Sequence, residues 1–209
     1  MENADSKRYS IIILIGPMSA GKSTIAKLLS SKLSIPRYEL DDVRQRFYTE
    51  IGYSERLASQ IVGEEGMKGL IHYWKPFEAY AVERAIAEFK NCVVDFGAGH
   101  SVYEDPELFS RVKEALKPVE NVIQILPSPD LDRSVEIVNQ RFSDLLVREV
   151  GKIDNELLQL NEFFVRHPSN HLLAKKTVYT EDKKPAEITD EIINWIQGTD
   201  GDFDNNTSN

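Results

Sequence analysis

The sequence is poor in cysteine and lacks any long apolar segment. Its 209 residues include one cysteine, Cys92, so no disulfide can form within the chain. No segment approaches the roughly 20 apolar residues that a membrane-spanning helix needs. The apolar run near the N-terminus is too short for the core of a signal peptide. These absences predict a cytoplasmic protein with no membrane partner, and the Val-Val run after Cys92 predicts that its thiol is buried in a strand.

Positive charge is also scarce, since 25 lysines and arginines stand against 34 aspartates and glutamates, for a formal net charge of −9. A nucleic-acid-binding surface needs a basic face, so the composition argues against a nucleic-acid partner. Part of the excess acid lies in residues 199–209, which contain no basic residue and cannot bury enough surface to become ordered. We predict disordered tails over residues 1–9 and 199–209, and a single folded domain over residues 10–198.

Short β-rich segments alternate with helical patterns along this domain. The predicted strands cover residues 10–15, 36–40, 92–96, 121–126 and 176–180. Three of them are almost continuously aliphatic, as in strands that helices cover on both faces. The alternation predicts an α/β domain with a mainly parallel sheet.

Apolar residues at helical spacing predict helices over four stretches. The stripes run through residues 25–33, 131–145, 153–164 and 188–195, and Pro185 and Gly198 mark the start and the end of the last one. Two of these helices fall between the fourth and the fifth strand, which is more than a plain crossover requires. We predict that they form a helical lid over about residues 130–165.

A glycine-rich loop joins the first strand to the first helix. Its sequence, GPMSAGKS, matches the pattern G-x-x-x-x-G-K-[ST] in full. Backbone N–H groups in such a loop, together with the positive end of the following helix, bind phosphates. We expect Lys22 to reach the β- and γ-phosphates of a nucleotide and the hydroxyl of Ser23 to hold Mg²⁺. The candidate nucleotide-binding residues are Gly16, Ser19, Ala20, Gly21, Lys22, Ser23 and Thr24.

Carboxylates follow the second and the third predicted strands. Asp95 ends the third strand, where it is placed to hold Mg²⁺ through a water, or alternatively to cap a helix or lie in a solvated turn. Glu39, Asp41 and Asp42 cluster after the second strand, and ligands of open α/β sheets bind beside the carboxyl ends of strands. We expect one aspartate to cap the helix that follows and the other to accept the proton of an attacking hydroxyl.

Three further segments offer candidates for contacts with the ligands. Two glycines in residues 97–99 let the backbone approach a substrate, and His100 either contacts that substrate or lies on the surface. The aromatic residues of segment 71–80 either stack on a planar substrate or pack in the core. The transferred phosphoryl group also needs positive charge from the lid. The lid cations are Arg133, Arg141, Arg148 and Lys152, of which Arg141 is our catalytic candidate.

The chain resembles the shikimate kinase type of the nucleoside-monophosphate-kinase-like P-loop family over nearly the whole domain. The segments that carry the resemblance are GPMSAGKST, YELD, GEEGMK, GAGH and the stretch that begins RHPSNH at residue 166. The resemblance implies a three-layer P-loop fold with five parallel strands in the order 2-3-1-4-5. It also implies ATP and Mg²⁺, and transfer of phosphate to a hydroxyl of a small molecule.

The same resemblance implies roles for individual residues. It places Glu39 near the metal and Asp41 on the acceptor hydroxyl. Lys68 stands where an arginine grips the acid of the acceptor, and Arg166 falls on an arginine that binds the carboxylate of the substrate. Gly97, Ala98 and Gly99 replace a glycine run that touches substrate.

The sequence departs from this family in ways that bear on the acceptor. The family's R-P-L-L lid motif is absent, and a lysine at position 68 cannot repeat the bidentate grip of an arginine. We therefore expect a related kinase that acts on a small, anionic acceptor other than shikimate. The alternatives are a nucleoside or antibiotic phosphotransferase with an uncharged acceptor, and a nucleotide-binding regulatory protein without an acceptor.

Overall fold

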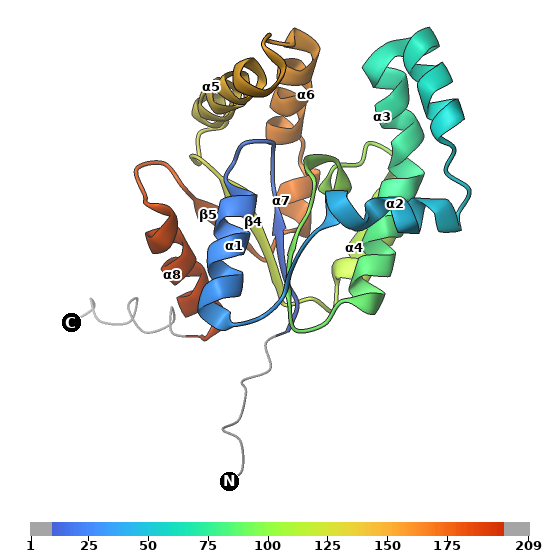
Figure 1. Ribbon diagram of the computed structural model, residues 1–209. Coiled ribbons are helices and arrows are strands. Elements are labelled where there is room, and N and C mark those ends of the chain that lie inside the picture. The colour runs from blue at the N-terminus through green and yellow to red at the C-terminus, as the bar shows by residue number, and fades with distance from the viewer. Residues whose placement is uncertain (1–9, 199–209) are drawn as a thin grey trace, which may run out of the picture.

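The computed structural model describes residues 10–198, which form a parallel sheet of five strands between two layers of helices (Figure 1). The strands are β1 (Ile12–Ile15), β2 (Arg37–Glu39), β3 (Val93–Asp95), β4 (Asn121–Leu126) and β5 (Lys176–Tyr179). They pair in the order β2-β3-β1-β4-β5. The predicted fold class, the five strands and their order are therefore confirmed. The two predicted tails lie outside the described residues and stay predictions.

The helices account for most of the remaining chain. They are α1 (Lys22–Leu33), α2 (Leu40–Glu50), α3 (Glu55–Glu88), α4 (Pro106–Leu116), α5 (Leu131–Val150), α6 (Asn155–Arg166), α7 (Ser169–Leu173) and α8 (Pro185–Ile196), with a 3-10 turn, η1, at Ala98–Ser101. Helices α1, α5, α6 and α8 match the predicted stripes, whereas α3, α4 and α7 were not predicted. Within residues 10–198, no helix combines the length and the apolar character needed to cross a bilayer.

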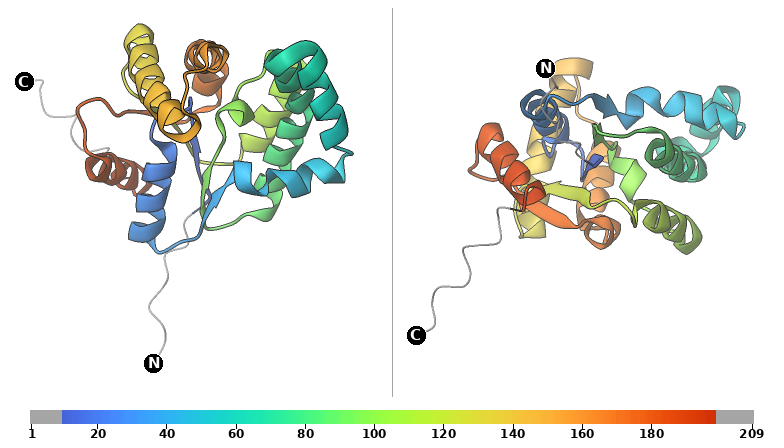
Figure 2. Two further views of the ribbon diagram at one scale, coloured as in Figure 1. Left: turned by 45° about the horizontal axis from the view of Figure 1, so that its top comes forward. Right: turned by 90° about the horizontal axis from the view of Figure 1, so that it is seen from below.

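Alternate residues of β1 enter two separate cores, one on each face of the sheet. Ile12 and Leu14 pack against α1 and α8, whereas Ile13 and Ile15 face α2, α3 and α4. Figure 2 (right) shows these two groups of helices on opposite sides of the sheet. All four side chains are fully buried. Burial of each aliphatic side chain contributes about 1.5–3 kcal/mol, so covering both faces stabilises the sheet strongly. This is why the strand reads as a continuous aliphatic run. Cys92, just before β3, is buried as predicted.

Helix α3 is a hairpin of two helical segments rather than one straight helix. Gly66 interrupts it with φ 68° and ψ −162°, a conformation that essentially only glycine adopts. The chain reverses there, so the two segments stand side by side (Figure 1). Apart from Ala58, the buried residues of α3 all lie after Gly66, so its apolar residues do not form one continuous stripe. We refer to this element as the α3 hairpin.

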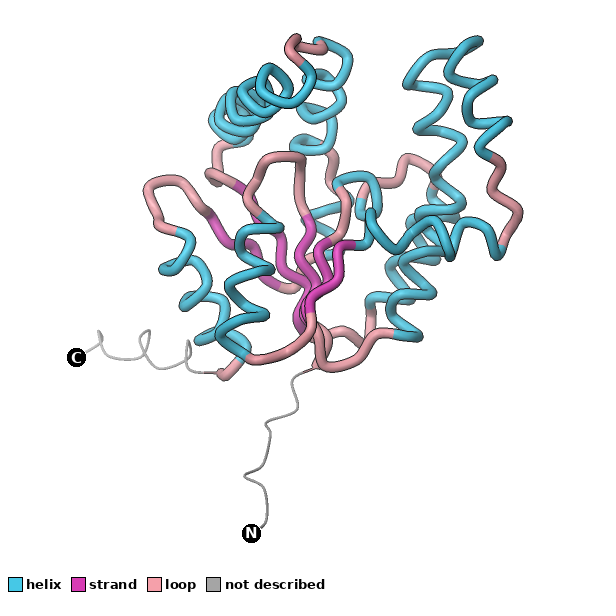
Figure 3. Tube along the Cα trace, in the orientation of Figure 1, coloured by secondary structure: helices cyan, strands magenta, loops and turns pink. Residues whose placement is uncertain are grey.

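A second helical hairpin, formed by α5 and α6, lies across the carboxyl ends of the strands (Figure 3). Each helix begins at an aspartate whose side chain accepts hydrogen bonds from backbone N–H groups of the first turn, Asp130 for α5 and Asp154 for α6. Gly151, with φ 78°, ends α5 and allows the chain to turn. We call this pair the lid hairpin, since it lies where the lid was predicted.

Candidate active site

The phosphate-binding loop takes a shape that its glycines make possible. Gly16 has φ 137°, and a Cβ atom there would lie 2.4 Å from the carbonyl oxygen of Ile125 in β4. Gly21 has φ 101° and is the N-cap residue of α1, so the positive end of that helix faces the loop. Between them Ser19 also adopts a positive φ, 59°. The loop therefore forms a concave turn of backbone N–H groups at the carboxyl end of β1.

Lys22 is buried at the base of this loop. Its Nζ donates a hydrogen bond to the carbonyl oxygen of Pro17 at 3.0 Å, which holds the side chain across the loop. Burial lowers the pKa of Lys22, while the negative charges of Asp95 and Asp41 raise it. The ammonium group is thus placed where anionic groups surround it, as expected for a cation that binds phosphate.

Ser23 and Asp95 are joined directly. The hydroxyl of Ser23 donates to Oδ2 of Asp95 at 2.5 Å. The second oxygen of Asp95, Oδ1, is buried and has no hydrogen-bond partner among residues 10–198. Burial raises the pKa of this carboxyl group, whereas Lys22 and the Ser23 hydrogen bond lower it. Asp95 therefore faces the phosphate loop, and it neither caps a helix nor lies in a solvated turn.

This pair fits the chemistry of Mg²⁺. Magnesium is bound through one or two protein oxygens together with substrate phosphates and water, and Ser23 and Asp95 offer a hydroxyl and an unpartnered carboxylate oxygen. No group of three or more His, Cys, Asp or Glu side chains within the described residues could hold a metal by itself. A metal at this position would therefore depend on the bound nucleotide for further ligands.

A cavity of about 220 Å³ connects the phosphate loop with the ends of β2 and β3. The predicted site residues that line it are Ser19, Lys22, Ser23, Glu39, Asp41, Asp95, Gly97 and Ala98. Phe142 and Leu145 of α5 line the same cavity, so the lid hairpin covers it. Gly16, Ala20, Gly21 and Thr24 shape the loop and the first turn of α1 but do not line the cavity.

The expectation that one of the two aspartates caps α2 is wrong. The helix begins at Leu40, directly after β2, so its N-cap residue is Glu39, whose side chain makes no capping hydrogen bond. Asp41 and Asp42 both lie in the first turn instead, where their charges interact favourably with the positive end of the helix. The short connection between strand and helix leaves no room for a separate capping residue.

The side chain of Asp41, in the first turn of α2, lies against the turn that follows β3. Its Oδ1 accepts a hydrogen bond from Nη1 of Arg44 at 3.0 Å. A Cβ atom at Gly97 would lie 2.3 Å from Oδ2, so the glycine makes room for this carboxylate. The Nδ1 atom of His100 is 3.9 Å from Oδ1. Asp41 is therefore held in place by α2 and by this turn, and it lines the cavity together with Lys22 and Ser23.

A buried ion pair supports this turn from behind. The Nζ of Lys75 lies 2.6 Å from Oε2 of Glu78 and donates to the carbonyl oxygen of Gly99 at 2.9 Å. A Cβ atom at Gly99 would lie 2.3 Å from Oε1 of Glu78. His100 is fully buried, not a surface residue, and neither ring nitrogen has a hydrogen-bond partner among residues 10–198. Both glycines thus accommodate carboxylates of the protein itself.

Sequence reasoning missed Lys75 and Glu78, although a signal was present. They lie three residues apart in the aromatic segment 71–80, a spacing that places opposite charges on one face of a helix. The aromatic rings around them pack rather than project freely. Tyr73 and Phe77 contact each other and Tyr53, at centroid distances of 5.1–5.7 Å, and join the core. This favours the core role for the segment.

Three predicted cationic residues lie outside the cavity. Lys68 is exposed on α3, two residues beyond the reversal of the chain at Gly66. Arg166, at the end of α6, is 2.7 Å from both Glu162 and Asp132. Arg141 is exposed on α5 and has no ion pair within residues 10–198, and the next residue, Phe142, lines the cavity.

The lid hairpin is bound directly to the phosphate loop. The backbone N–H of Met18 donates to Oδ1 of Asn161 at 2.8 Å, and Nδ2 of Asn161 donates back to the carbonyl oxygen of Met18 at 3.3 Å. Asn161 also donates to Oδ1 of Asn139 at 3.1 Å, which connects α6 with α5. Sequence analysis did not identify Asn161, although a polar residue within the apolar stripe of α6 was a visible signal.

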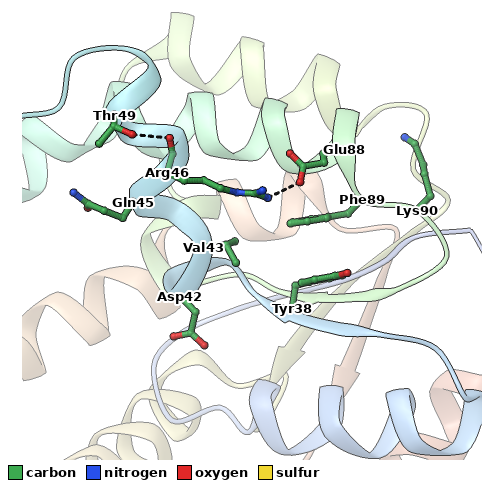
Figure 4. A pocket seen from close by; sticks show the side chains of 9 residues that line it. All are labelled: Tyr38, Asp42, Val43, Gln45, Arg46, Thr49, Glu88, Phe89 and Lys90. Carbon is green, nitrogen blue, oxygen red and sulfur yellow. Dashed lines mark hydrogen bonds and ion pairs between the residues drawn. The ribbon is translucent and has the colours of Figure 1, made fainter.

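A larger groove of about 950 Å³ lies on the other side of α2, and it lacks the residues of the phosphate loop (Figure 4). Its floor is the stacked pair Tyr38 and Phe89, with ring centroids 4.3 Å apart. Arg46 crosses it to reach Glu88 at 2.6 Å, and Asp42 lines its rim. Asp41 and Asp42 therefore line different cavities. The candidate active site is the smaller one, because Lys22 and Ser23 line it.

Comparisons with known proteins identify the family to which this chain is similar. The profile of the shikimate kinase family matches residues 18–197. The shikimate kinase of Persephonella marina is 29% identical over 186 residues, which cover 89% of this chain and 98% of that protein. The shikimate kinase of Francisella tularensis subsp. novicida is 26% identical over 190 residues, which cover 90% of this chain and 96% of the relative.

A solved structure supports the fold. The shikimate kinase of Acinetobacter baumannii, in complex with shikimate, has a TM-score of 0.63 and 22% sequence identity. The alignment covers 91% of this chain and 94% of that one. The profile match spans most of the described residues, and the strand order 2-3-1-4-5 is the one that the resemblance to this family implied. The chain therefore belongs to the shikimate kinase family of P-loop kinases.

Proposed function

We propose that this protein transfers the γ-phosphoryl group of ATP, in a Mg²⁺-dependent reaction, to a hydroxyl group of a small molecule. The observation that carries the proposal is the single cavity that Lys22 and Ser23 share with Asp41. The cavity thus holds a cation that can bind phosphate and, besides the carboxylate assigned to Mg²⁺, a second carboxylate that can accept the proton of a hydroxyl. A protein that only binds nucleotide has no need of the second group, which counts against the regulatory alternative.

The roles of the residues follow from their surroundings. Lys22 and the loop N–H groups would hold the phosphates, with Gly16, Ser19, Ala20, Gly21 and Thr24 shaping that loop. Ser23 and Asp95 would hold Mg²⁺, and Glu39, which pairs with Arg37 and lines the same cavity, would bind its waters. The metal, when bound, neutralises charge on the phosphates. Asp41 would orient the acceptor hydroxyl and take its proton.

Arg141 remains our candidate for the lid cation at the γ-phosphate. It has no ion pair within residues 10–198, whereas Arg133 pairs with Glu181 and Arg148 with Glu149. Its charge is thus free to meet a phosphate. Phe142 and Leu145 cover the cavity and would exclude water from it. This exclusion would protect ATP from hydrolysis. We place this ATP-dependent reaction in the cytoplasm, where the Cys92 thiol stays reduced.

The family name points to shikimate, which is an anionic acceptor. Lys68 and Arg166 were expected to bind such an anion, but Lys68 is exposed on α3 and Arg166 is paired with Glu162 and Asp132. Their placement gives an anionic acceptor no direct support. We therefore propose a hydroxyl acceptor and assign no charge to it.

The test of the proposed function is the loss of transfer in Lys22→Met. The purified full chain is incubated with Mg²⁺, ATP and a panel of hydroxyl acceptors, and the phosphorylated product is detected by mass spectrometry. We expect the rate to fall by about 10²–10³-fold or more, because a preorganised charge at the phosphates is lost. Lys27→Met is the matched control, since Lys27 is exposed on the same helix. Full activity in Lys22→Met would overturn the site assignment.

A further inference from the structure

The side chain of His100 is buried beside the candidate active site without a hydrogen bond. It is fully buried, and neither Nδ1 nor Nε2 has a hydrogen-bond partner among residues 10–198. The ring does not line the cavity, so its place is behind the site rather than in it. Buried polar side chains are nearly always hydrogen-bonded, and the exceptions often have a functional reason.

The backbone around the 3-10 turn η1 holds this ring in place. The N–H of His100 donates to the carbonyl oxygen of Gly97 at 3.0 Å, and the hydroxyl of Tyr103 donates to the carbonyl oxygen of His100 at 3.0 Å. The centroid of the imidazole lies 6.3 Å from that of the Phe96 ring. A side chain that is anchored in this way can orient a neighbour.

The neighbour that His100 faces is the carboxylate of Asp41. Nδ1 lies 3.9 Å from Oδ1 of Asp41, which is about 1 Å longer than an N–H···O hydrogen bond. The same oxygen accepts from Nη1 of Arg44 at 3.0 Å. Catalytic hydrogen bonds are often long before the substrate binds and shorten in the complex. A shift of the carboxylate by about 1 Å would complete a hydrogen bond to the ring.

The surroundings of His100 favour a neutral ring with its proton on Nδ1. Burial lowers the pKa of His100. Of the charged groups that face the ring, Glu78 and Asp41 raise this pKa, and the cations Arg44 and Lys75 lower it. A neutral imidazole has one N–H, and its other nitrogen is an acceptor. A proton on Nε2 would turn the lone pair of Nδ1 toward the carboxylate, whereas a proton on Nδ1 offers that carboxylate a donor.

We propose that His100 is a positioning residue for phosphoryl transfer. Its Nδ1–H donates to Asp41 and holds the carboxylate in the orientation that takes the proton of the acceptor hydroxyl. This inference rests on the proposed function, since Asp41 is the base only if the protein is a kinase. A base that a third group orients is a recurring arrangement where a nucleophile is activated.

The position of His100 in the fold gives this bond its value. Arg44 lies on the same helix as Asp41, so it cannot fix that helix relative to the phosphates. His100 follows β3, which pairs with β1, and β1 leads into the phosphate loop. A hydrogen bond from His100 therefore fixes the base relative to the group that it serves.

The first experiment compares variants that differ in the donor they offer. The amide nitrogen of asparagine takes the place of Nδ1, whereas phenylalanine fills the space without a donor. The full chain is assayed with Mg²⁺, ATP and shikimate, or with any acceptor of the panel above that is phosphorylated faster. We expect kcat of His100→Phe to fall by about 10–10²-fold, because misplacing a catalytic group by about 1 Å has an effect of this size. KM for ATP should change by less than about twofold.

His100→Asn should keep a higher kcat than His100→Phe. A merely structural role predicts the reverse order, because phenylalanine fills the buried space better than asparagine does. The matched control is Ser101→Ala. Ser101 is also fully buried, its hydroxyl has no hydrogen-bond partner among residues 10–198, and its removal should leave kcat unchanged.

A double-mutant cycle tests whether His100 acts through Asp41. Asp41→Asn lowers kcat by removing the base. His100→Phe added to Asp41→Asn should lower kcat by less than about twofold further, since residues that act as a unit are not additive. Independent, multiplicative losses would overturn the proposal.

The position of the ring proton is measured on the unmodified protein. Nitrogen NMR of the imidazole distinguishes a neutral ring protonated on Nδ1 from one protonated on Nε2. We expect the proton of His100 on Nδ1 at neutral pH, and a proton on Nε2 would overturn the proposal. This measurement decides the question even if His100→Phe does not fold.

The outcomes separate this inference from the proposed function. Unchanged kcat in His100→Phe overturns the inference and leaves the kinase assignment standing. Absence of any phosphorylated product from the unmodified protein, with every acceptor of the panel, overturns both.

Discussion

Asn161 of the lid hairpin binds both backbone polar groups of Met18 in the phosphate loop, with hydrogen bonds of 2.8 and 3.3 Å across 143 residues of sequence. The amide side chain is completely buried. It therefore satisfies a backbone N–H and a backbone carbonyl of the half-buried Met18 in the loop. The consequence is that the lid hairpin and the phosphate loop are held in one fixed relation.

Removal of this amide should loosen the phosphate loop. In Asn161→Leu the N–H and C=O of Met18 lose their partners, and each buried unsatisfied group costs about 1–3 kcal/mol. We expect the free energy of unfolding to fall by at least this amount, and KM for ATP to rise more than KM for the acceptor. Urea unfolding and steady-state kinetics measure the two effects. Gln159→Leu, at an exposed position of α6, is the control. Equal changes in both KM values would contradict a role for Asn161 in positioning the loop.

Gly16 should be the least replaceable of the glycines with positive φ. In Gly16→Ala the new methyl group would lie 2.4 Å from the carbonyl oxygen of Ile125, a backbone atom that cannot move away cheaply. At Gly52 the backbone φ is also positive, but no atom lies within 4 Å of the methyl group that Gly52→Ala would add. Only the cost of a left-handed backbone, about 1–2 kcal/mol, therefore applies. Gly63→Ala, inside exposed helix, should stabilise by about 0.5–1 kcal/mol. Thermal unfolding of the three variants tests this ranking, which fails if Gly16→Ala is no worse than Gly52→Ala.

Asp95 should make the nucleotide-free protein less stable as pH rises. Burial raises the pKa of this carboxyl group, so the folded state holds a proton that the unfolded chain releases above about pH 3.9. The free energy of unfolding therefore falls between that pH and the raised pKa of the folded state. Asp95→Asn should remove this dependence and be more stable near neutrality, while binding Mg²⁺ and ATP more weakly.

Urea unfolding from pH 4 to 8, without metal or nucleotide, measures this effect. Asp190→Asn is the control, because Asp190 forms an exposed pair with Lys32 that contributes little. If Asp95→Asn kept the pH dependence of the unmodified protein, Asp95 would not be the group that causes it.

His100 should affect stability in the opposite direction, so that the protein becomes less stable as pH falls. Burial lowers its pKa, while Glu78 and Asp41 raise it and Arg44 and Lys75 lower it further. The unfolded chain then binds a proton below about pH 6.5 that the folded state resists, so stability is lost as pH falls through that range. His100→Phe keeps a ring in the site and should flatten the loss between pH 6.5 and 5. The exposed His171 provides the control variant, His171→Gln, which should retain the loss.

The phosphate side of the site was predictable because its chemistry is local. Lys22 and Ser23 lie in one continuous motif, and a buried strand and an amphipathic helix flank it. Asp95 could be placed because it ends an aliphatic strand. The acceptor side was less predictable. Asp41 was identified, but the capping role for its neighbour failed because α2 starts immediately after β2.

The sequence by itself determined the strands, the phosphate loop and the helices with one apolar stripe, because patterns within ten or twenty residues encode them. Only the tertiary structure decided which charges meet at the acceptor. Arg166 is drawn to Asp132 and Glu162, and Gly97 and Gly99 make room for Asp41 and Glu78. The physical reason is that ion pairs and close packing depend on distances between separate elements, and no local pattern of residues fixes those distances.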